Sequence, residues 1–178
     1  MKIFEIEESH NLIDMNEVCL YLDNLELNIE MKEIIKKMCG VASSCNDKDI
    51  YLSFDDFKKI MSHEEAVFGS IVEYAHENNN SLEEAIKLSL QDASLDYNAI
   101  NKALGILMHF EIHPDFPLVP ISEGLEIIYD NVDENADIIW GTTTNSAVSE
   151  NYVKVSVLIS GFQKNNYKNT PINNYETT

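Results

Sequence analysis

The sequence contains no arginine. Its 12 basic residues are all lysines, and 31 acidic residues bring the formal net charge to −19 at pH 7. A chain so acidic repels polyanions, which argues against direct binding to nucleic acid or to an acidic membrane surface. Arginine is also the fork-shaped donor that most often grips phosphates and carboxylates through two hydrogen bonds. Its absence disfavours phosphoryl chemistry, although lysine can act there as a point charge.

Long apolar runs and cysteine are scarce as well. No run approaches the 18 or more apolar residues of a membrane span. Residues 1–10 have no basic segment followed by an apolar one, so we expect no signal peptide and a cytoplasmic location. The three cysteines, Cys19, Cys39 and Cys45, are odd in number and form no CxxC pair. They favour buried free thiols in a reducing compartment over a disulfide framework or a metal site.

The pattern of apolar residues predicts helices interleaved with strands. In residues 15–38 the apolar side chains recur at spacings of three and four, which predicts one amphipathic helix, or two in succession, stopped by Gly40. A short strand is predicted at residues 1–8. Further strands are predicted at residues 66–75, 103–112, 136–144 and 152–162, and further helices at 55–61, 81–91 and 121–132.

This order predicts an α/β or α+β layer structure. We expect a mixed four-stranded sheet with helices packed on it, preceded by a long helix. The last two strands are joined by a short loop, so we expect them to pair antiparallel. The chain then divides into an N-terminal strand and helical segment (1–49), the sheet domain (50–162) and a polar, Asn-rich tail expected to be disordered (163–178).

Two adjacent carboxylates stand out in the stretch IYLSFDDFKKIM, residues 50–61. Asp55 and Asp56 could be an acidic catalytic pair, or they could begin a helix. Ser53 as the N-cap, with Asp56 three residues later, approximates a capping box, and a carboxylate in the first turn gains about 0.3–1 kcal/mol from the helix dipole. The helical interpretation predicts that Asp56→Ala lowers stability by about 0.5–2 kcal/mol. The alternative for Asp56 is a role at a subunit contact.

A second group of polar residues lies in HFEIH, residues 109–113. Two imidazoles with Glu111 between them could bind a metal ion. On a strand, however, His109 and His113 are about 13 Å apart, so they would not share an ion and we expect no metal site. His63 is expected to lie in a turn at the end of a helix.

Two stretches resemble a known family. ADIIWGTTTNSAVSENYVKVSVLISGF, residues 136–162, resembles the bacterial tubulin-like cell-division GTPase FtsZ, whose pattern there is close to A-N-I-I-F-G, a polar turn and V-T-V-I-A-T-G-F. Residues 51–61 are similar to that family's N-L-D-F-A-D-V-K-T-I-M loop, which carries catalytic acids and precedes a helix. The segments between follow the family's order. The resemblance therefore implies the tubulin-like C-terminal domain over about residues 50–162.

The departures from the family pattern concern its chemistry. The family's G-G-G-T-G-T-G phosphate loop has no counterpart, since all six glycines of this sequence are isolated. In the catalytic loop the Asn position is Tyr51, the first acid is Ser53, and only the second acid survives, as Asp56. The resemblance thus implies a degenerate catalytic loop, and we expect no catalytic, cofactor-binding or metal-binding residues. The tail also lacks the family's D-I-P-x-F-L adaptor peptide.

The functional prediction is a non-catalytic FtsZ-like interaction module without GTPase activity of its own. It would need no cofactor, and its partner would be a protein: a second copy, or a tubulin-like division polymer. One alternative is the C-terminal half of a split or truncated GTPase, acting with a separate GTP-binding partner. Another is a small-molecule enzyme on a mutase-like fold, which the missing arginine disfavours for anionic substrates.

Overall fold

The computed structural model describes residues 15–25, 27–41, 47–63, 66–74, 80–93 and 97–161. The strand predicted at residues 1–8, Cys45 and the tail at 163–178 lie outside these ranges. The elements, in chain order, are α1 (Met15–Asp23), α2 (Ile29–Lys36), the π-helical turn η1 (Lys37–Val41), α3 (Phe54–Ser62), β1 (Ala66–Tyr74), α4 (Asn80–Asp92), the 3₁₀ turn η2 (Tyr97–Lys102), β2 (Gly105–Ile112), α5 (Val119–Tyr129), β3 (Asp137–Thr144) and β4 (Tyr152–Ser160).

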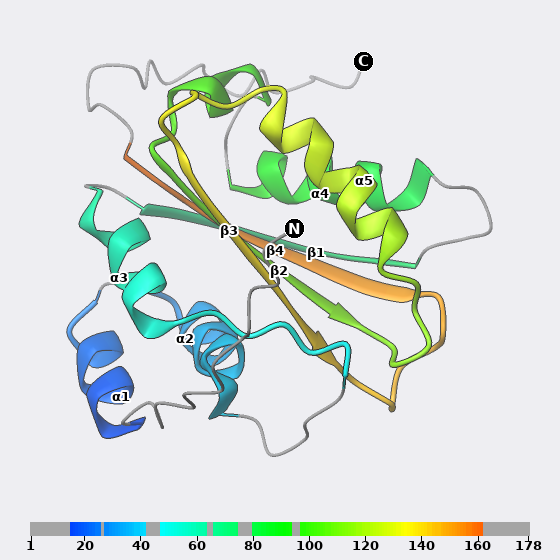
Figure 1. Ribbon diagram of the computed structural model, residues 1–178, viewed down its shortest axis with the longest axis horizontal. Coiled ribbons are helices and arrows are strands. Elements are labelled where there is room, and N and C mark those ends of the chain that lie inside the picture. Colours follow the sequence, from blue (N-terminus) through cyan, green and yellow to red (C-terminus); the bar gives the residue numbers. More distant parts are fainter. Residues whose placement is uncertain are drawn as a thin grey trace, which may run out of the picture.

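The four strands form one mixed sheet in the order β1-β4-β2-β3. The strand β4 is antiparallel to both β1 and β2, whereas β2 and β3 are parallel. A mixed four-stranded sheet was predicted from the sequence, and this prediction is confirmed. Because β4 and β2 are the central strands, β1 and β3 form the two edges (Figure 1).

The predicted pairing of the last two strands is wrong. The strands β3 and β4 do not pair, because β2 lies between them. Nearly every residue of β2 and β4 is buried, while the first half of β3 is only half-buried. The two most apolar strands therefore take the centre of the sheet, where both faces are covered. The β3–β4 loop passes over one neighbouring strand, a crossing of about 10 Å at a strand spacing of about 4.8 Å.

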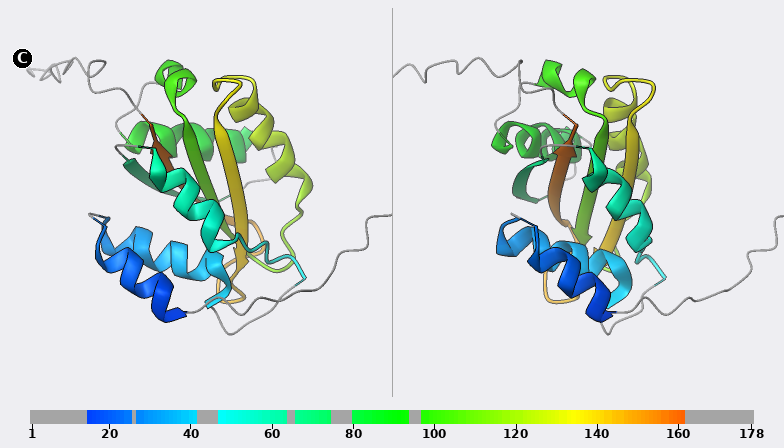
Figure 2. Two further views of the ribbon diagram at one scale, coloured as in Figure 1. Left: turned by 60° about the vertical axis from the view of Figure 1, so that its left-hand side comes forward. Right: turned by 90° about the vertical axis from the view of Figure 1, so that its left-hand side faces the viewer.

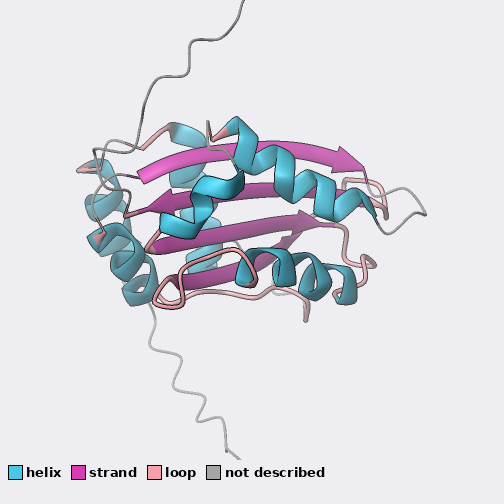
Figure 3. Ribbon diagram, turned by 90° about the horizontal axis from the view of Figure 1, so that it is seen from above, coloured by secondary structure: helices cyan, strands magenta, loops and turns pink. Residues whose placement is uncertain are grey.

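Helices cover both faces of the sheet (Figure 2). Helices α4 and α5 lie along one face, which Figure 3 shows from above, and α1, α2 and α3 lie on the other. Each face has its own apolar core. Alternate residues of β2 divide between them, since Ile106, Met108 and Phe110 point toward α4 and α5, and Leu107 toward α1–α3.

The segment before the sheet is two helices in succession, one of the two forms that the sequence left open, so the long helix of the fold prediction is interrupted. Two asparagines account for the break. The Asn24 Nδ2 atom donates to the Leu20 carbonyl oxygen, and Asn28 is the N-cap of α2, its Oδ1 atom accepting from the Met31 amide at 2.7 Å. Asparagine side chains that bond to the backbone compete with continued helix. Within the described ranges, no helix has the length and apolarity needed to cross a membrane.

Candidate interaction site

The segment at residues 47–53, called here the 47–53 loop, runs along the outer edge of β3. Ile50 forms an isolated antiparallel bridge with Thr142. The Ile50 amide donates to the Thr142 carbonyl oxygen at 3.1 Å, and the Thr142 amide donates to the Ile50 carbonyl oxygen at the same distance. A short piece of this loop therefore extends the sheet beyond β3, and part of that edge is not free.

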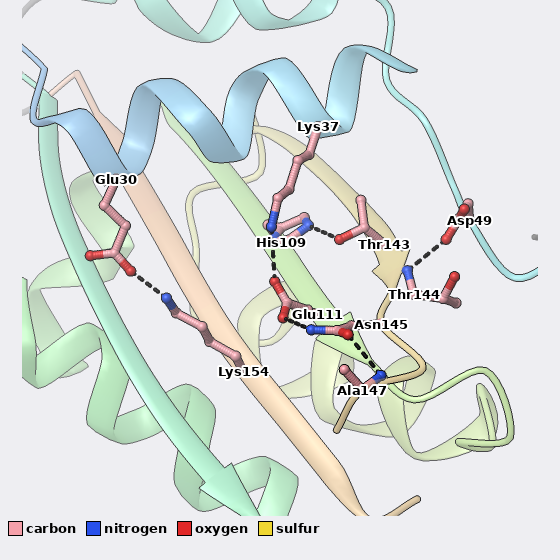
Figure 4. Close-up of polar contacts among 10 residues, drawn as sticks. All are labelled: Glu30, Lys37, Asp49, His109, Glu111, Thr143, Thr144, Asn145, Ala147 and Lys154. Carbon is pink, nitrogen blue, oxygen red and sulfur yellow. Dashed lines mark hydrogen bonds and ion pairs between the residues drawn. The ribbon is translucent and has the colours of Figure 1, made fainter. Parts of the chain in front are cut away.

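Side chains fix the loop on both sides of this bridge. The Thr142 hydroxyl accepts from the Ile50 amide at 3.0 Å and donates to the Lys48 carbonyl oxygen. The Asp49 Oδ1 atom accepts from the Thr144 amide at 2.7 Å, a contact drawn in Figure 4. Farther along, the Leu52 amide donates to the Met38 carbonyl oxygen at 2.9 Å. The loop is held to β3 and to η1 over most of its length.

The loop leads into α3, whose first turn contains the two candidate carboxylates. Ser53 is the N-cap and accepts from the Asp56 amide at 3.0 Å. The Asp56 carboxylate accepts from the Ser53 hydroxyl, and the Asp55 carboxylate pairs with Lys58 at 2.7 Å. The two carboxylates thus have separate partners, both within α3 and its cap. This arrangement matches a helix start and not an acidic pair that shares one substrate atom.

Buried apolar residues anchor α3 and the loop to the core of the protein. Leu52, Phe54, Phe57 and Ile60 are buried in the core that α1, α2 and α3 share with the sheet. The Tyr21 ring of α1 packs edge-on against the Phe54 ring at 5.4 Å between centroids. Such aromatic pairs add about 0.5–1.5 kcal/mol beyond the burial of their area.

The residues between these apolar positions face outward. Tyr51 is 38% exposed, and its hydroxyl donates to the Asp49 Oδ2 atom at 3.2 Å. Ser53, Asp55 and Asp56 are exposed as well. The three positions that the resemblance assigns to a degenerate catalytic loop, Tyr51, Ser53 and Asp56, are therefore all part of the exposed surface, where Asp56 contacts Ser53 and Tyr51 contacts Asp49. The surface combines an aromatic ring with carboxylates.

A polar layer lies beside the loop, between β2, β3 and η1 (Figure 4); its His109 and Thr143 are buried, whereas Glu111 is half-buried and Lys37 exposed. The His109 Nε2 atom is 2.9 Å from the Thr143 hydroxyl, and its Nδ1 atom is buried without a hydrogen-bond partner. Burial lowers the pKa of His109 to about 3, so this imidazole is neutral at physiological pH.

Glu111 connects the layer to two other elements. Its carboxylate accepts from the Asn145 side chain at 2.9 Å and pairs with Lys37 at 3.2 Å. Burial alone would raise the pKa of Glu111, but the bonds from Asn145 and Lys37 together hold it below the usual range. His109 and His113 have different partners, since the His113 Nδ1 atom accepts from the Asp115 amide at 3.1 Å. Among the described residues, no group of three or more His, Cys, Asp or Glu side chains could hold a metal ion.

His63 has a more specific partner than the sequence indicated. It ends α3, and its Nε2 atom lies 3.3 Å from the Asp137 Oδ2 atom at the start of β3, while the Lys59 ammonium binds the other oxygen at 2.5 Å. The Lys59 bond, with a further contribution from His63, lowers the pKa of Asp137. Sequence reasoning missed both Asp137 and Thr142, because each pairs with a residue more than 70 positions away and no local pattern marks them.

Comparison with known proteins agrees with this architecture. Residues 67–163, more than half of the chain, match the family model described as "FtsZ family, C-terminal domain". The cell division protein FtsZ of Helicobacter pylori (strain J99) is 26% identical over 133 residues, which cover 74% of this chain and 34% of the relative. Cell division protein FtsZ 1 of Methanocaldococcus jannaschii is 31% identical over 114 residues, covering 64% of this chain and 30% of the relative.

A solved structure has the same fold. The structure titled "FtsZ dimer, empty (M. jannaschii)" superposes with a TM-score of 0.56 at 24% identity, over 82% of this chain and 43% of the other. The chain thus spans about a third of the length of these curated relatives. Because the family model matches more than half of the chain, this chain belongs to the FtsZ family and is built on that family's C-terminal domain.

Proposed function

We propose that this chain is a non-catalytic FtsZ-like interaction module that assembles with itself or with a tubulin-like cell-division polymer. The observation that carries the proposal is the 47–53 loop, which is fixed on β3 and exposes Tyr51 beside carboxylates. A segment that is already ordered loses little conformational entropy on binding, which suits it to contact another protein. Tyrosine is also among the side chains enriched at protein interfaces.

The same loop argues against GTP hydrolysis by this chain. Two of its three family-like positions carry Tyr51 and Ser53 in place of amide and acid, and Asp56 contacts the cap of its own helix. The six glycines of the sequence are isolated, so no glycine-rich loop is available to surround a phosphate. The division into residues 1–49, 50–162 and 163–178, and the cytoplasmic location, stay predictions.

Co-sedimentation tests the interaction. FtsZ from the same organism is assembled with GTP and pelleted with this chain, while sedimentation velocity of the chain alone measures self-association. We expect association in at least one assay and a loss of tenfold or more for Tyr51→Ala. Tyr129→Ala is the matched control, because Tyr129 is 52% exposed on α5, on the opposite face of the sheet. Failure to associate in either assay, or equal loss by both variants, would contradict the proposal.

A nucleotide titration tests the absence of catalysis. The purified chain is mixed with GTP, and both binding and phosphate release are measured. We expect neither. Saturable binding or turnover by the chain alone would overturn the non-catalytic assignment. Co-purification from the native host with a separate protein that carries a glycine-rich phosphate loop would favour the split-GTPase alternative instead.

A further inference from the structure

We infer that Thr142 is the residue that positions the 47–53 loop, and that Gly141 provides the space for it. The importance of the loop rests on the proposed function, but its attachment to β3 is visible in the contacts themselves. Neither residue belongs to the loop, and both lie more than 85 positions away from it in the sequence.

The Thr142 hydroxyl makes two bonds to the loop at once. It accepts from the Ile50 amide at 3.0 Å and donates to the Lys48 carbonyl oxygen. A hydroxyl can do this because it has one proton and two lone pairs. Thr142 itself is fully buried, so these bonds are shielded from competing water. The side chain therefore holds the backbone on either side of Asp49.

The sheet does not need this hydroxyl. Thr142 pairs with Phe110 of β2 through its backbone on the inner side of β3, and with Ile50 on the outer side. The isolated bridge contributes two backbone hydrogen bonds to the loop. The hydroxyl shares the single Ile50 amide proton with the Thr142 carbonyl oxygen in a three-centre bond, and it adds one further bond to the Lys48 carbonyl oxygen. The side chain thus extends the attachment of the loop to Lys48, which the backbone bridge does not reach.

Gly141 determines how closely the loop approaches β3. A Cβ atom on Gly141 would lie 2.5 Å from the Ile50 carbonyl oxygen and 3.1 Å from the Met38 Cε atom. The methionine end could move, but the Ile50 oxygen is backbone, so any side chain at position 141 would displace the loop. Glycine is required here by the close approach of another backbone.

The consequence extends to the exposed surface. Asp49 lies between Lys48 and Ile50, and its two carboxylate oxygens bond to the Thr144 amide and to the Tyr51 hydroxyl. A shift of the backbone on both sides of Asp49 therefore changes the position of Tyr51. Thr142 acts on the contact surface through the loop and does not itself reach that surface.

The test compares Thr142→Val, which keeps the shape and removes the hydroxyl, with Thr142→Ser, which restores it. Amide hydrogen exchange is measured on the full chain. We expect Thr142→Val to speed exchange of the Ile50 amide by tenfold or more, while the amides of Leu107 and Leu158 in the central strands keep their rates. We expect Thr142→Ser to behave like the unmodified chain and Gly141→Ala to behave like Thr142→Val. In the co-sedimentation assay we expect Thr142→Val and Gly141→Ala to associate less than the unmodified chain, and Thr142→Ser to associate as well as the unmodified chain does.

Three results would overturn the inference. The Ile50 amide could keep its rate in Thr142→Val, Thr142→Ser could fail to restore it, or exchange could accelerate equally throughout the sheet. The last result would make Thr142 a residue of general stability. If the unmodified chain associates with nothing, the proposed function fails, but the exchange measurements still decide the role of Thr142. The two failures are therefore distinguishable.

Discussion

The Ser53 hydroxyl and the Asp56 carboxylate are hydrogen-bonded to each other at 2.7 Å, and the Ser53 oxygen also accepts from the Asp56 amide at 3.0 Å. The oxygen that caps α3 therefore belongs to Ser53, and the carboxylate orients the hydroxyl that supplies it. From the sequence, the cost of a lost cap was assigned to Asp56→Ala. The geometry assigns it to Ser53.

We expect Ser53→Ala to lower the free energy of unfolding by about 0.5–2 kcal/mol, because it removes the capping oxygen. Asp56→Ala should cost less, about 0.3–1 kcal/mol, because the Ser53–amide bond survives and only a first-turn carboxylate is lost. Urea denaturation of both variants measures the difference. A larger cost for Asp56→Ala than for Ser53→Ala would show that the carboxylate, and not the hydroxyl, stabilises this end of the helix.

Gly69 in β1 is predicted to tolerate no side chain. A Cβ atom there would lie 2.1 Å from the Ser89 carbonyl oxygen and 2.6 Å from the Ala93 amide nitrogen, both backbone atoms of the α4 segment. Gly69→Ala must push α4 away from the sheet, and we expect a loss of about 1–3 kcal/mol or more in chemical denaturation.

Gly124→Ala is the control for that experiment. The nearest atom to its Cβ would be the Ile86 Cδ1 atom at 2.8 Å, the movable end of a flexible side chain. Gly124 also lies inside α5, where alanine gains up to about 1 kcal/mol in helix propensity. We expect a change near zero. Equal destabilisation by both substitutions would mean that glycine content, and not the close approach of α4, governs the effect.

His109 predicts a specific pH dependence of stability. Burial lowers its pKa from the ordinary 6.5 to about 3 in the folded chain, and its charged neighbours are Glu111, Lys37 and Lys154. Above pH 6.5 the imidazole is neutral in both states and adds no pH dependence. Below pH 6.5 the unfolded chain binds a proton that the folded chain does not, so stability falls as pH falls, by up to about 1.4 kcal/mol per pH unit.

Denaturation between pH 7 and pH 5 measures this effect, and comparison with a His109 variant separates it from the other groups that titrate over the same interval. Over this interval, His109 should lower the free energy of unfolding of the unmodified chain by up to about 2 kcal/mol. We expect this part of the loss to be absent in His109→Gln. Identical pH profiles for the two chains would contradict a buried neutral His109.

The two described cysteines should differ in reactivity. Burial raises the pKa of the Cys39 thiol to about 12, whereas Cys19 is half-buried. Since the thiolate is the reactive form, a disulfide reagent at pH 8 should label Cys19 at least tenfold faster than Cys39. The measurement uses a Cys45→Ser background and single Cys19→Ser and Cys39→Ser variants. Equal rates in the folded protein would be inconsistent with the position of Cys39 in the core.

The local elements could be predicted from the sequence because their signals are local. The buried strand at residues 103–112 appears two residues shorter, as β2, and the strand predicted at residues 66–75 is one residue shorter, as β1. Alternating or continuous apolar residues determine such segments directly. The order of the strands is different in kind. It depends on which strands can be buried on both faces. The short loop between β3 and β4 led to the prediction that these two strands pair, whereas β3 pairs with β2.

The candidate site was predicted only in part for the same reason. Tyr51, Ser53 and Asp56 were found from a motif, and the cap at Ser53 follows from residue spacing. The bond from Thr142 to Ile50 spans 92 positions, so nothing in the local pattern of either segment indicates the other. The glycine at position 141 carried the only signal, since an isolated glycine within a strand often marks the close approach of another backbone.

The central position of β4 has a consequence for synthesis. It is the last strand of the sheet along the chain, yet it is the only described strand that pairs with β1, and it also forms one side of β2. The ribosome adds residues at about 5–20 per second. When β1 and β2 have been synthesised, the position between them in the sheet is still empty, because β4 takes that position and is made last. A nascent chain that stops before Tyr152 can pair β2 with β3 but leaves β1 without a partner. This fold can be completed only after its final strand has left the ribosome.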